Sequence, residues 1–79
     1  MLRFRLRELM AEKSFREGRR VSFEEISQVT GINRTTLSKM ANVRGYNTGT
    51  KNLDYLCKYF GCKVCELVEY VEMDEDQIG

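Results

Sequence analysis

The segment from residue 33 to residue 42 carries the side chains that are best suited to contact another molecule. At helical spacing Leu37 and Met40 fall on one side of this segment, and the other long side chains point outward. The outward set is Arg34, Thr35, Thr36, Ser38, Lys39 and Asn42. It holds hydroxyls, an amide and cations but no carboxylate, whereas a merely solvated helix face is usually rich in Glu and Lys. Because such side chains reach base edges and phosphates, this composition indicates nucleic-acid binding.

The three cysteines suggest a second chemistry, metal binding or redox sensing. Cys62 and Cys65 form a C-x-x-C pair, and Cys57 precedes them. Structural zinc requires four ligands, and the chain has no histidine, so the site is one ligand short unless Glu66 or a second chain completes it. Cys57 also falls within an apolar stripe, where a free cysteine behaves as a small hydrophobic residue. We therefore expect no metal and no cofactor, although a redox-dependent change in binding would reopen the question.

The sequence offers little that would support catalysis. It has no histidine and no glycine-rich phosphate loop after a strand. Its carboxylates cluster in an acidic C-terminal segment, where nothing raises a pKa or excludes water. We therefore expect a binding protein and not an enzyme.

A capping signal marks the start of the helix that precedes the polar segment. Ser22 and Glu25 form an S-x-x-E capping box, in which each side chain satisfies a backbone N–H group at the helix start. This predicts a helix over about residues 23–30. The helix ends at Gly31, which adopts a left-handed conformation without the penalty of a Cβ atom.

The polar segment itself is predicted to be a second helix, over about residues 34–41, with Asn33 as its N-cap. Two helices that cross steeply over a short turn need a small residue at their closest approach, a glycine in the turn and apolar residues that hold the second helix. Those places are filled in order by Ser27, Gly31, Ile32 and Leu37. The same spacing predicts one inward-facing apolar set, made of Ile26, Val29, Ile32, Leu37 and Met40. The pattern is typical of a helix-turn-helix.

The rest of the chain supplies short helices that can hold this pair. Apolar spacing predicts helices over about residues 5–13, 51–60 and 64–70, the first ending by Gly18. Leu2, Phe4 and Leu6 alternate, so the extreme N-terminus is alternatively a short extended piece. Five short helices predict an all-α compact domain over residues 1–71, followed by an acidic tail over 72–79 that we expect to be flexible.

Charge is divided unevenly along the chain. Residues 1–51 hold eleven Lys/Arg against five Asp/Glu, a balance of +6, whereas residues 52–79 hold two against seven, a balance of −5. A basic half can meet phosphates while the acidic half faces away from them. No apolar run is long enough to span a bilayer, and charges interrupt the N-terminus too often for a signal peptide. We therefore expect a cytoplasmic protein that binds no membrane.

The helix-turn-helix segment Phe23 to Asn42 resembles that of Cro/CI-type (XRE) transcriptional regulators. Residues 53–62 and 66–70 are similar to the last two helices of compact members, so the resemblance covers roughly residues 2–71. It implies a five-helix lambda-repressor-like fold, a third helix in the major groove of double-stranded DNA, and often a homodimer on a palindromic operator. Many members carry Gln where this chain has Phe23, and we expect Phe23 to pack inward or against the loop instead.

Position by position, the resemblance implies two sets of DNA contacts. The side chains nearest the bases would be Asn33, Arg34, Thr35, Thr36 and Ser38. The phosphate contacts would come from Ser22, Lys39, Asn42, Arg44, Tyr46, Asn47 and Thr48. Arg19 and Arg20 are weaker candidates. The function implied is that of a transcriptional regulator that acts as a repressor.

A different function remains open for the C-terminal half. Tyr55, Tyr59 and Tyr70, with Val68 and Val71, could form a partly exposed apolar patch that binds a protein partner or a second copy of the chain. The protein would then be an antitoxin-like interaction module whose DNA binding is autoregulatory. Selection of binding sites from random duplexes would separate this alternative from the first.

Overall fold

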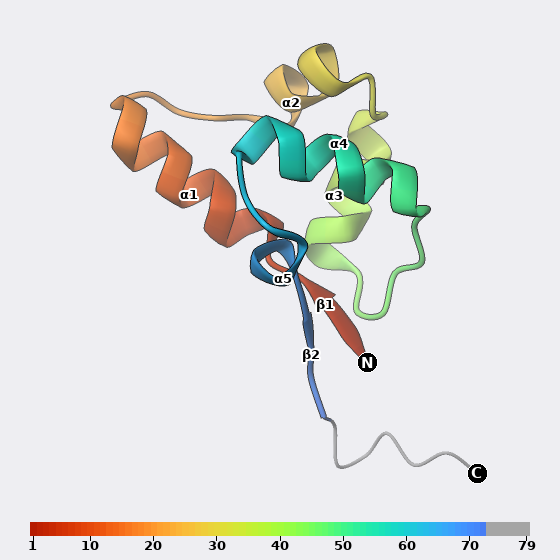
Figure 1. Ribbon diagram of the computed structural model, residues 1–79. Coiled ribbons are helices and arrows are strands. Elements are labelled where there is room, and N and C mark those ends of the chain that lie inside the picture. Colours follow the sequence, from red (N-terminus) through yellow and green to blue (C-terminus); the bar gives the residue numbers. More distant parts are fainter. Residues whose placement is uncertain (73–79) are drawn as a thin grey trace, which may run out of the picture.

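The computed structural model describes residues 1–72 and shows five helices between two short strands (Figure 1). In chain order the elements are β1 (Leu2–Phe4), α1 (Leu6–Glu17), α2 (Phe23–Thr30), α3 (Arg34–Asn42), α4 (Thr50–Phe60), α5 (Val64–Leu67) and β2 (Val68–Tyr70). The predicted five-helix all-α fold is confirmed, with the strand pair as a small addition. Apart from Glu72, the predicted tail lies outside the described residues, so the division at residue 71 stays a prediction.

The ends of α2 and α3 are set by the capping residues that the sequence indicates. The Ser22 hydroxyl accepts a hydrogen bond from the Glu25 N–H at 3.2 Å, and the Asn33 side chain accepts one from the Thr35 N–H at 2.7 Å. Gly31 has a φ of 81° and ends α2 in the left-handed conformation. Both helices begin where predicted, and α3 extends one residue further, to Asn42. Only the Ser22 half of the predicted capping box is present, because the Glu25 carboxylate binds Arg19 instead of a backbone N–H group.

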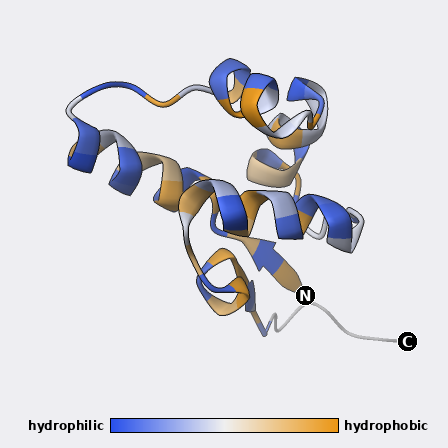
Figure 2. Ribbon diagram, turned by 45° about the horizontal axis from the view of Figure 1, so that its top comes forward, coloured by the Kyte–Doolittle hydropathy of each residue, from blue (hydrophilic) through white to orange (hydrophobic). Residues whose placement is uncertain are grey.

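Each helix contributes one fully buried side chain to the core. These side chains are Leu6, Ile26, Leu37, Leu56 and Leu67. Figure 2 shows the corresponding alternation of apolar and polar segments along the helices. Because each helix is short, no pair of helices can form a core alone. The buried side chains Leu37 and Met40 attach α3 to this common core.

The two strands form an antiparallel pair that stands away from the helices (Figure 1). Phe4 lies opposite Val68, and both side chains pack against the core. Beyond them, Leu2 and Tyr70 are opposite each other and exposed. The alternating N-terminal residues thus form an extended piece, as one of the two sequence interpretations expected.

The prediction of a last helix over residues 64–70 is wrong in its second half. The helix ends at Leu67, and Val68–Tyr70 form β2. The Arg5 N–H donates to the Leu67 carbonyl at 2.7 Å, which starts the pairing with the N-terminal strand. This partner lies more than sixty residues away in the sequence, so the local apolar spacing could not reveal it. The first helix continues past its apolar stretch to Glu17 and ends at Gly18, as predicted.

Val29 is a second correction, because it was assigned to the inward-facing set and is 66% exposed. The buried side of α2 is formed by Phe23 and Ile26, with Thr30 half-buried between α2 and the turn. Three residues after Ile26, the Val29 side chain points about 60° away from Ile26 around the helix axis. It therefore lies outside the side of α2 that packs on the core. Val64 is also exposed.

None of the helices within residues 1–72 has the length and apolar composition needed to cross a membrane.

Candidate nucleic-acid interface

A groove of about 970 Å³ runs between α3, the start of α2 and the side of α1. From α3 it is lined by Arg34, Thr35, Ser38 and Lys39. The other polar and charged lining residues are Arg7, Arg20, Ser22, Glu24, Glu25 and Gln28. The groove therefore gathers four cations, two carboxylates and several short polar side chains from three helices and the connection before α2 on one open surface.

The predicted base-reading residues fall into two groups in this surface. Arg34, Thr35 and Ser38 line the groove together, and the Arg34 side chain is 65% exposed. Thr36 is half-buried and does not line the groove. Asn33 is exposed, but its side-chain oxygen is engaged in capping α3. The structure thus brings three of the five residues together.

Among the predicted phosphate contacts, Ser22 and Lys39 line the same groove. The Ser22 hydroxyl caps α2, so the N-terminal end of α2, with its partial positive charge, faces the groove as well. Lys39 is exposed and makes no ion pair within the described part of the chain. Both residues therefore lie on the same open surface as Arg34.

Asn42 is held by a network that sequence reasoning missed. The Arg7 guanidinium donates to the Asn42 Oδ1 atom at 2.5 and 3.2 Å and lies over the Phe23 ring, 5.9 Å from its centroid. The Asn42 amide donates in turn to the Ser38 carbonyl at 2.9 Å. Asn42 thereby fixes Arg7 of α1 beside α3, where Arg7 lines the groove. Phe23 packs against the core, as expected for an apolar residue at a position where many family members carry Gln.

The remaining predicted contacts are spread along the loop between α3 and α4. Arg44 and Asn42 line a second hollow of about 330 Å³, next to the strand pair. Tyr46, Asn47 and Thr48 line a third of about 430 Å³. Tyr46 and Thr48 are half-buried, whereas Asn47 is exposed. These residues lie at and beyond the C-terminal end of α3, and none of them lines the main groove.

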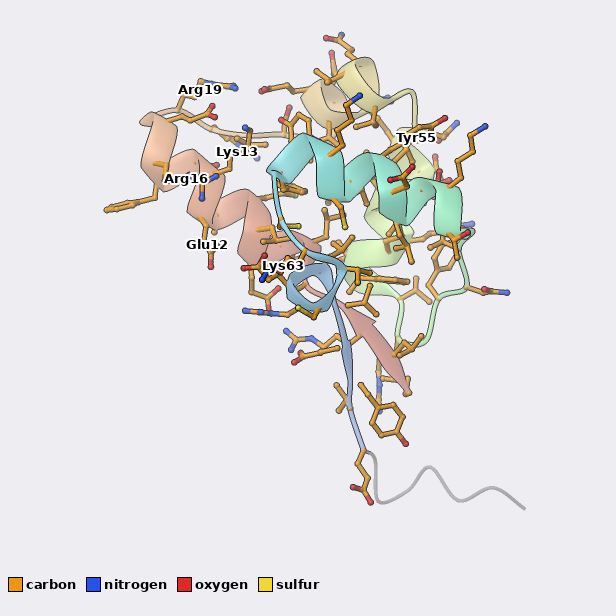
Figure 3. All side chains as sticks on the ribbon, viewed as in Figure 1. Glu12, Lys13, Arg16, Arg19, Tyr55 and Lys63 are labelled. Carbon is orange, nitrogen blue, oxygen red and sulfur yellow. The ribbon has the colours of Figure 1, made fainter. Side chains whose placement is uncertain are left out.

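A different set of charges, near the end of α1, is compensated by ion pairs. Arg19 binds both carboxylate oxygens of Glu25, at 2.6 and 2.7 Å, and also contacts Glu17 at 2.8 Å. Lys13 pairs with Glu17 at 2.8 Å and lies over the Tyr59 ring. Figure 3 shows Lys13 and Arg19 on α1 and the connection that follows it. This ion-paired cluster leaves Arg19 little capacity to bind phosphate.

The ion pairs shift the protonation of the two carboxylates. The hydrogen bond from Arg19 holds the pKa of Glu25 below its ordinary value of 4.5, and the hydrogen bond from Lys13 does the same for the pKa of Glu17. Burial raises the pKa of Tyr59, whose hydroxyl donates to Glu25 at 3.3 Å. Both carboxylates are therefore ionised at neutral pH, and the cluster remains paired.

Two further residues line the groove, of which one was a weak candidate and the other was not predicted. Arg20 was a candidate equal to Arg19, and it lines the groove while Arg19 binds Glu25. Gln28 lines the groove one helical turn after Glu24. Because residues four apart lie on the same side of a helix, the sequence could have placed Gln28 beside Glu24. The position of Arg7 in the groove could not be predicted in this way, because it depends on how α1 packs.

The cysteines lie at the junction of α4 and α5. Cys57 and Cys62 are half-buried against the core, and Cys65 is exposed. Burial and the neighbouring Cys57 raise the pKa of Cys62 to about 11, so its thiol is protonated at neutral pH. Within residues 1–72, no group of three or more potential ligands is arranged to hold a metal ion.

Comparison with known proteins assigns the chain to a family. Residues 5–73 match the Cro/C1-type HTH DNA-binding domain. Searches of curated proteins and of solved structures found no match. Domains of the matched type bind DNA and serve in transcription regulation, and they are typically not enzymes. The match covers nearly the whole described region, including the helix-turn-helix and the groove beside it, and the chain therefore belongs to the Cro/C1-type helix-turn-helix DNA-binding family.

Proposed function

We propose that this protein is a transcriptional repressor that binds a specific operator in double-stranded DNA, with α3 in the major groove. The observation that carries this proposal is the shared groove of Arg34, Thr35, Ser38 and Lys39. An α-helix fits the major groove, and polar and cationic side chains on its outer side can read base edges there. Its action would take place in the cytoplasm.

In this proposal the base-reading residues are Asn33, Arg34, Thr35, Thr36 and Ser38. Arg34 pairs with Glu24 at only 3.4 Å, and both side chains are largely exposed. Such a pair is weak in water, so DNA can displace Glu24 from Arg34 at little cost. Arg34 and Thr35 stand at the N-terminal end of α3, the part that reaches deepest into the groove in helix-turn-helix proteins.

The phosphate contacts in this proposal are made by Ser22, Lys39, Asn42, Arg44, Tyr46, Asn47 and Thr48. We add Arg7 and Arg20, which line the main groove. Asn42 acts through Arg7, because its Oδ1 atom already accepts the Arg7 guanidinium. Phosphate contacts of this kind fix the orientation of the protein on the duplex but carry no sequence information directly.

The active form on DNA would be a homodimer. A helix of nine residues is only about 14 Å long, so α3 can read only a few base pairs. Two copies separated by about 34 Å would double the recognised sequence and would select a palindromic site.

Selection of binding sites from a pool of random duplexes tests the proposal. We expect a palindromic sequence to be enriched by the wild-type chain and by Arg16→Ala, which changes an exposed residue outside the groove. Arg34→Ala should enrich a relaxed or altered sequence. A wild-type chain that enriches no sequence would refute specific recognition.

A second candidate function, binding of a protein partner, is favoured by one surface. Val29 and Tyr55 are exposed, and with Thr30, Lys58 and Tyr59 they line a hollow of about 550 Å³ between α2 and α4. Figure 3 labels Tyr55 on α4. Tyr70 lies on the strand pair and is not part of this hollow. If the hollow binds a regulatory partner, Val29→Glu should abolish regulation of a reporter while the purified protein keeps its DNA affinity.

A further inference from the structure

The sequence that follows β2 is strongly acidic. Residues 72–79 contain Glu72, Asp74, Glu75 and Asp76 and no Lys or Arg. The residue before them, Val71, is firmly held, since its N–H donates to the Met1 carbonyl at 2.8 Å and its carbonyl accepts from the Met1 amino group at 2.9 Å. The starting point of the acidic segment is therefore fixed by the strand pair.

This starting point lies near two cations, Arg7 of α1 and Arg44 of the loop after α3. Val71 lines the hollow of about 330 Å³ that Arg7, Asn42 and Arg44 also line. Arg7 additionally lines the main groove, so this residue borders both the hollow and the groove. The first carboxylate follows Val71 directly and the last is Asp76, so these five residues can span up to about 17 Å. The carboxylates therefore begin at the edge of the hollow that Val71 lines.

Two cations of the hollow, Arg3 and Arg7, differ in whether a carboxylate neutralises their charge. Arg3 forms ion pairs with Glu8 and Glu69. Arg7, in contrast, is bound by the neutral amide of Asn42 and forms no ion pair with a carboxylate of the described residues. Arg7 therefore retains a charge that a carboxylate or a phosphate can bind.

We propose that the acidic segment Glu72 to Asp76 competes with DNA phosphates for Arg7 and Arg44. The competition is intramolecular, because the segment begins in the hollow that these two arginines line. A tethered ligand of this kind acts at an effective concentration on the order of millimolar, which lets weak surface ion pairs compete. This inference rests on the proposed function, since it assigns a regulator to the same DNA-binding surface.

The competition weakens binding to every duplex, because the phosphate contacts that it opposes are made to any sequence. Operator binding adds base contacts from α3, which the acidic segment does not oppose. The segment therefore lowers the affinity for operator and random DNA by a common factor, while the ratio of the two affinities stays set by the base contacts.

The test compares two variants of the full chain. In the neutral variant, Asp74→Asn, Glu75→Gln and Asp76→Asn remove three charges; in the matched control, Asp74→Glu, Glu75→Asp and Asp76→Glu keep them. At ~0.05 M salt we expect the neutral variant to bind a random duplex about threefold to tenfold more tightly than wild type. The gain should disappear at ~0.5 M salt, and the control should match wild type.

A second measurement needs no DNA. In ¹⁵N-resolved NMR spectra, the Nε–H signals of Arg7 and Arg44 should shift in the neutral variant and stay in place in the control. Unchanged arginine signals together with unchanged affinity for random duplexes would overturn the competition, while operator selection would still report on the proposed function. If the arginine signals shift but no variant binds DNA, the contact exists and the proposed function fails instead.

Discussion

Two regions of the molecule hold several cations each, and they use them differently. In the groove, Arg7, Arg20 and Lys39 form no ion pair with the described carboxylates, and Arg34 has only a loose contact with Glu24. In the ion-paired cluster at the end of α1, Arg19 and Lys13 are bound at 2.6–2.8 Å by Glu17 and Glu25. Of these two regions, the groove holds four basic residues that can offer charge to a ligand, whereas the two of the cluster are compensated by carboxylates.

The difference arises on a single short helix, α2. Its first turn carries Glu24 and Glu25 in succession, and successive helical residues point about 100° apart. Both glutamates line the groove, but Glu25 is engaged by Arg19 and Tyr59, while Glu24 makes only the 3.4 Å contact with Arg34. The groove therefore holds the cations Arg7, Arg20, Arg34 and Lys39 against two carboxylates, one of which Arg19 already compensates.

The comparison is tested most strongly by removing one arginine from each region. We expect Arg34→Ala to cost about 1–3 kcal/mol of binding to the selected operator and to relax base choice at one position, because it removes a base-edge contact. Arg19→Ala is the matched control and should leave operator affinity nearly unchanged. Quantitative binding titrations on the operator and on random DNA measure both. Equal losses for the two variants would contradict the assignment of separate roles.

Ser22 connects the two regions, because it caps the helix that carries both glutamates. We expect Ser22→Ala to lower the free energy of unfolding by about 1 kcal/mol, since the Glu25 N–H loses its hydrogen-bond acceptor. Ser22→Asn supplies another capping oxygen and should restore most of the loss. Urea denaturation measures both variants. An unfolding free energy that is the same for Ser22→Ala and wild type would show that the cap contributes nothing.

The role of Arg7 sharpens the description of the groove. We expect Arg7→Ala to weaken binding to all DNA about threefold to fivefold at ~0.1 M salt and to reduce the salt slope by about one unit, as for one phosphate contact. Asn42→Ala should reproduce part of this loss, because Asn42 holds the guanidinium. In the double variant the losses should not add. Additive losses would mean that Asn42 contacts DNA independently of Arg7.

The smallest expected effect is a pH dependence of the ion-paired cluster. The pKa of Glu25 is lowered in the folded state, so its contribution to stability is present above the ordinary value of 4.5 and is lost as pH falls through the lowered value. Glu25→Gln should therefore be less stable than wild type at neutral pH, and the difference should vanish once the pH has fallen below the lowered pKa of Glu25. Thermal unfolding across pH measures this. A difference that persists in acid would have to come from packing and not from the ion pair.

Local sequence signals predicted the helix-turn-helix well because its determinants are local. The capping residues Ser22 and Asn33 and the glycine at position 31 act on backbone groups within a few residues. Buried positions such as Leu37 and Met40 follow from helical spacing alone. Together with the family resemblance, these signals predicted the start of both helices and the outward position of Arg34 and Lys39.

Predictions failed where a distant segment decides the outcome. Val68–Tyr70 continue the apolar spacing of a helix but become a strand because Leu2–Phe4 supply its hydrogen-bond partners. Val29 looked equivalent to Ile26, yet no neighbouring helix covers it. In both cases the residue's own type permits two environments, and only packing selects between them.

By itself, the sequence determined where the helices of the DNA-binding unit begin and which of their residues are apolar or charged, because caps, glycines and helical spacing operate within one or two turns. Only the tertiary structure decided which charges are available to a ligand. Arg19 and Arg20 are adjacent in the chain, and Arg19 is bound by Glu25 while Arg20 lines the groove. Arg7 reaches the groove because α1 packs beside α3. Electrostatic pairing depends on distance in space, and that distance is set by the packing of helices around a common core.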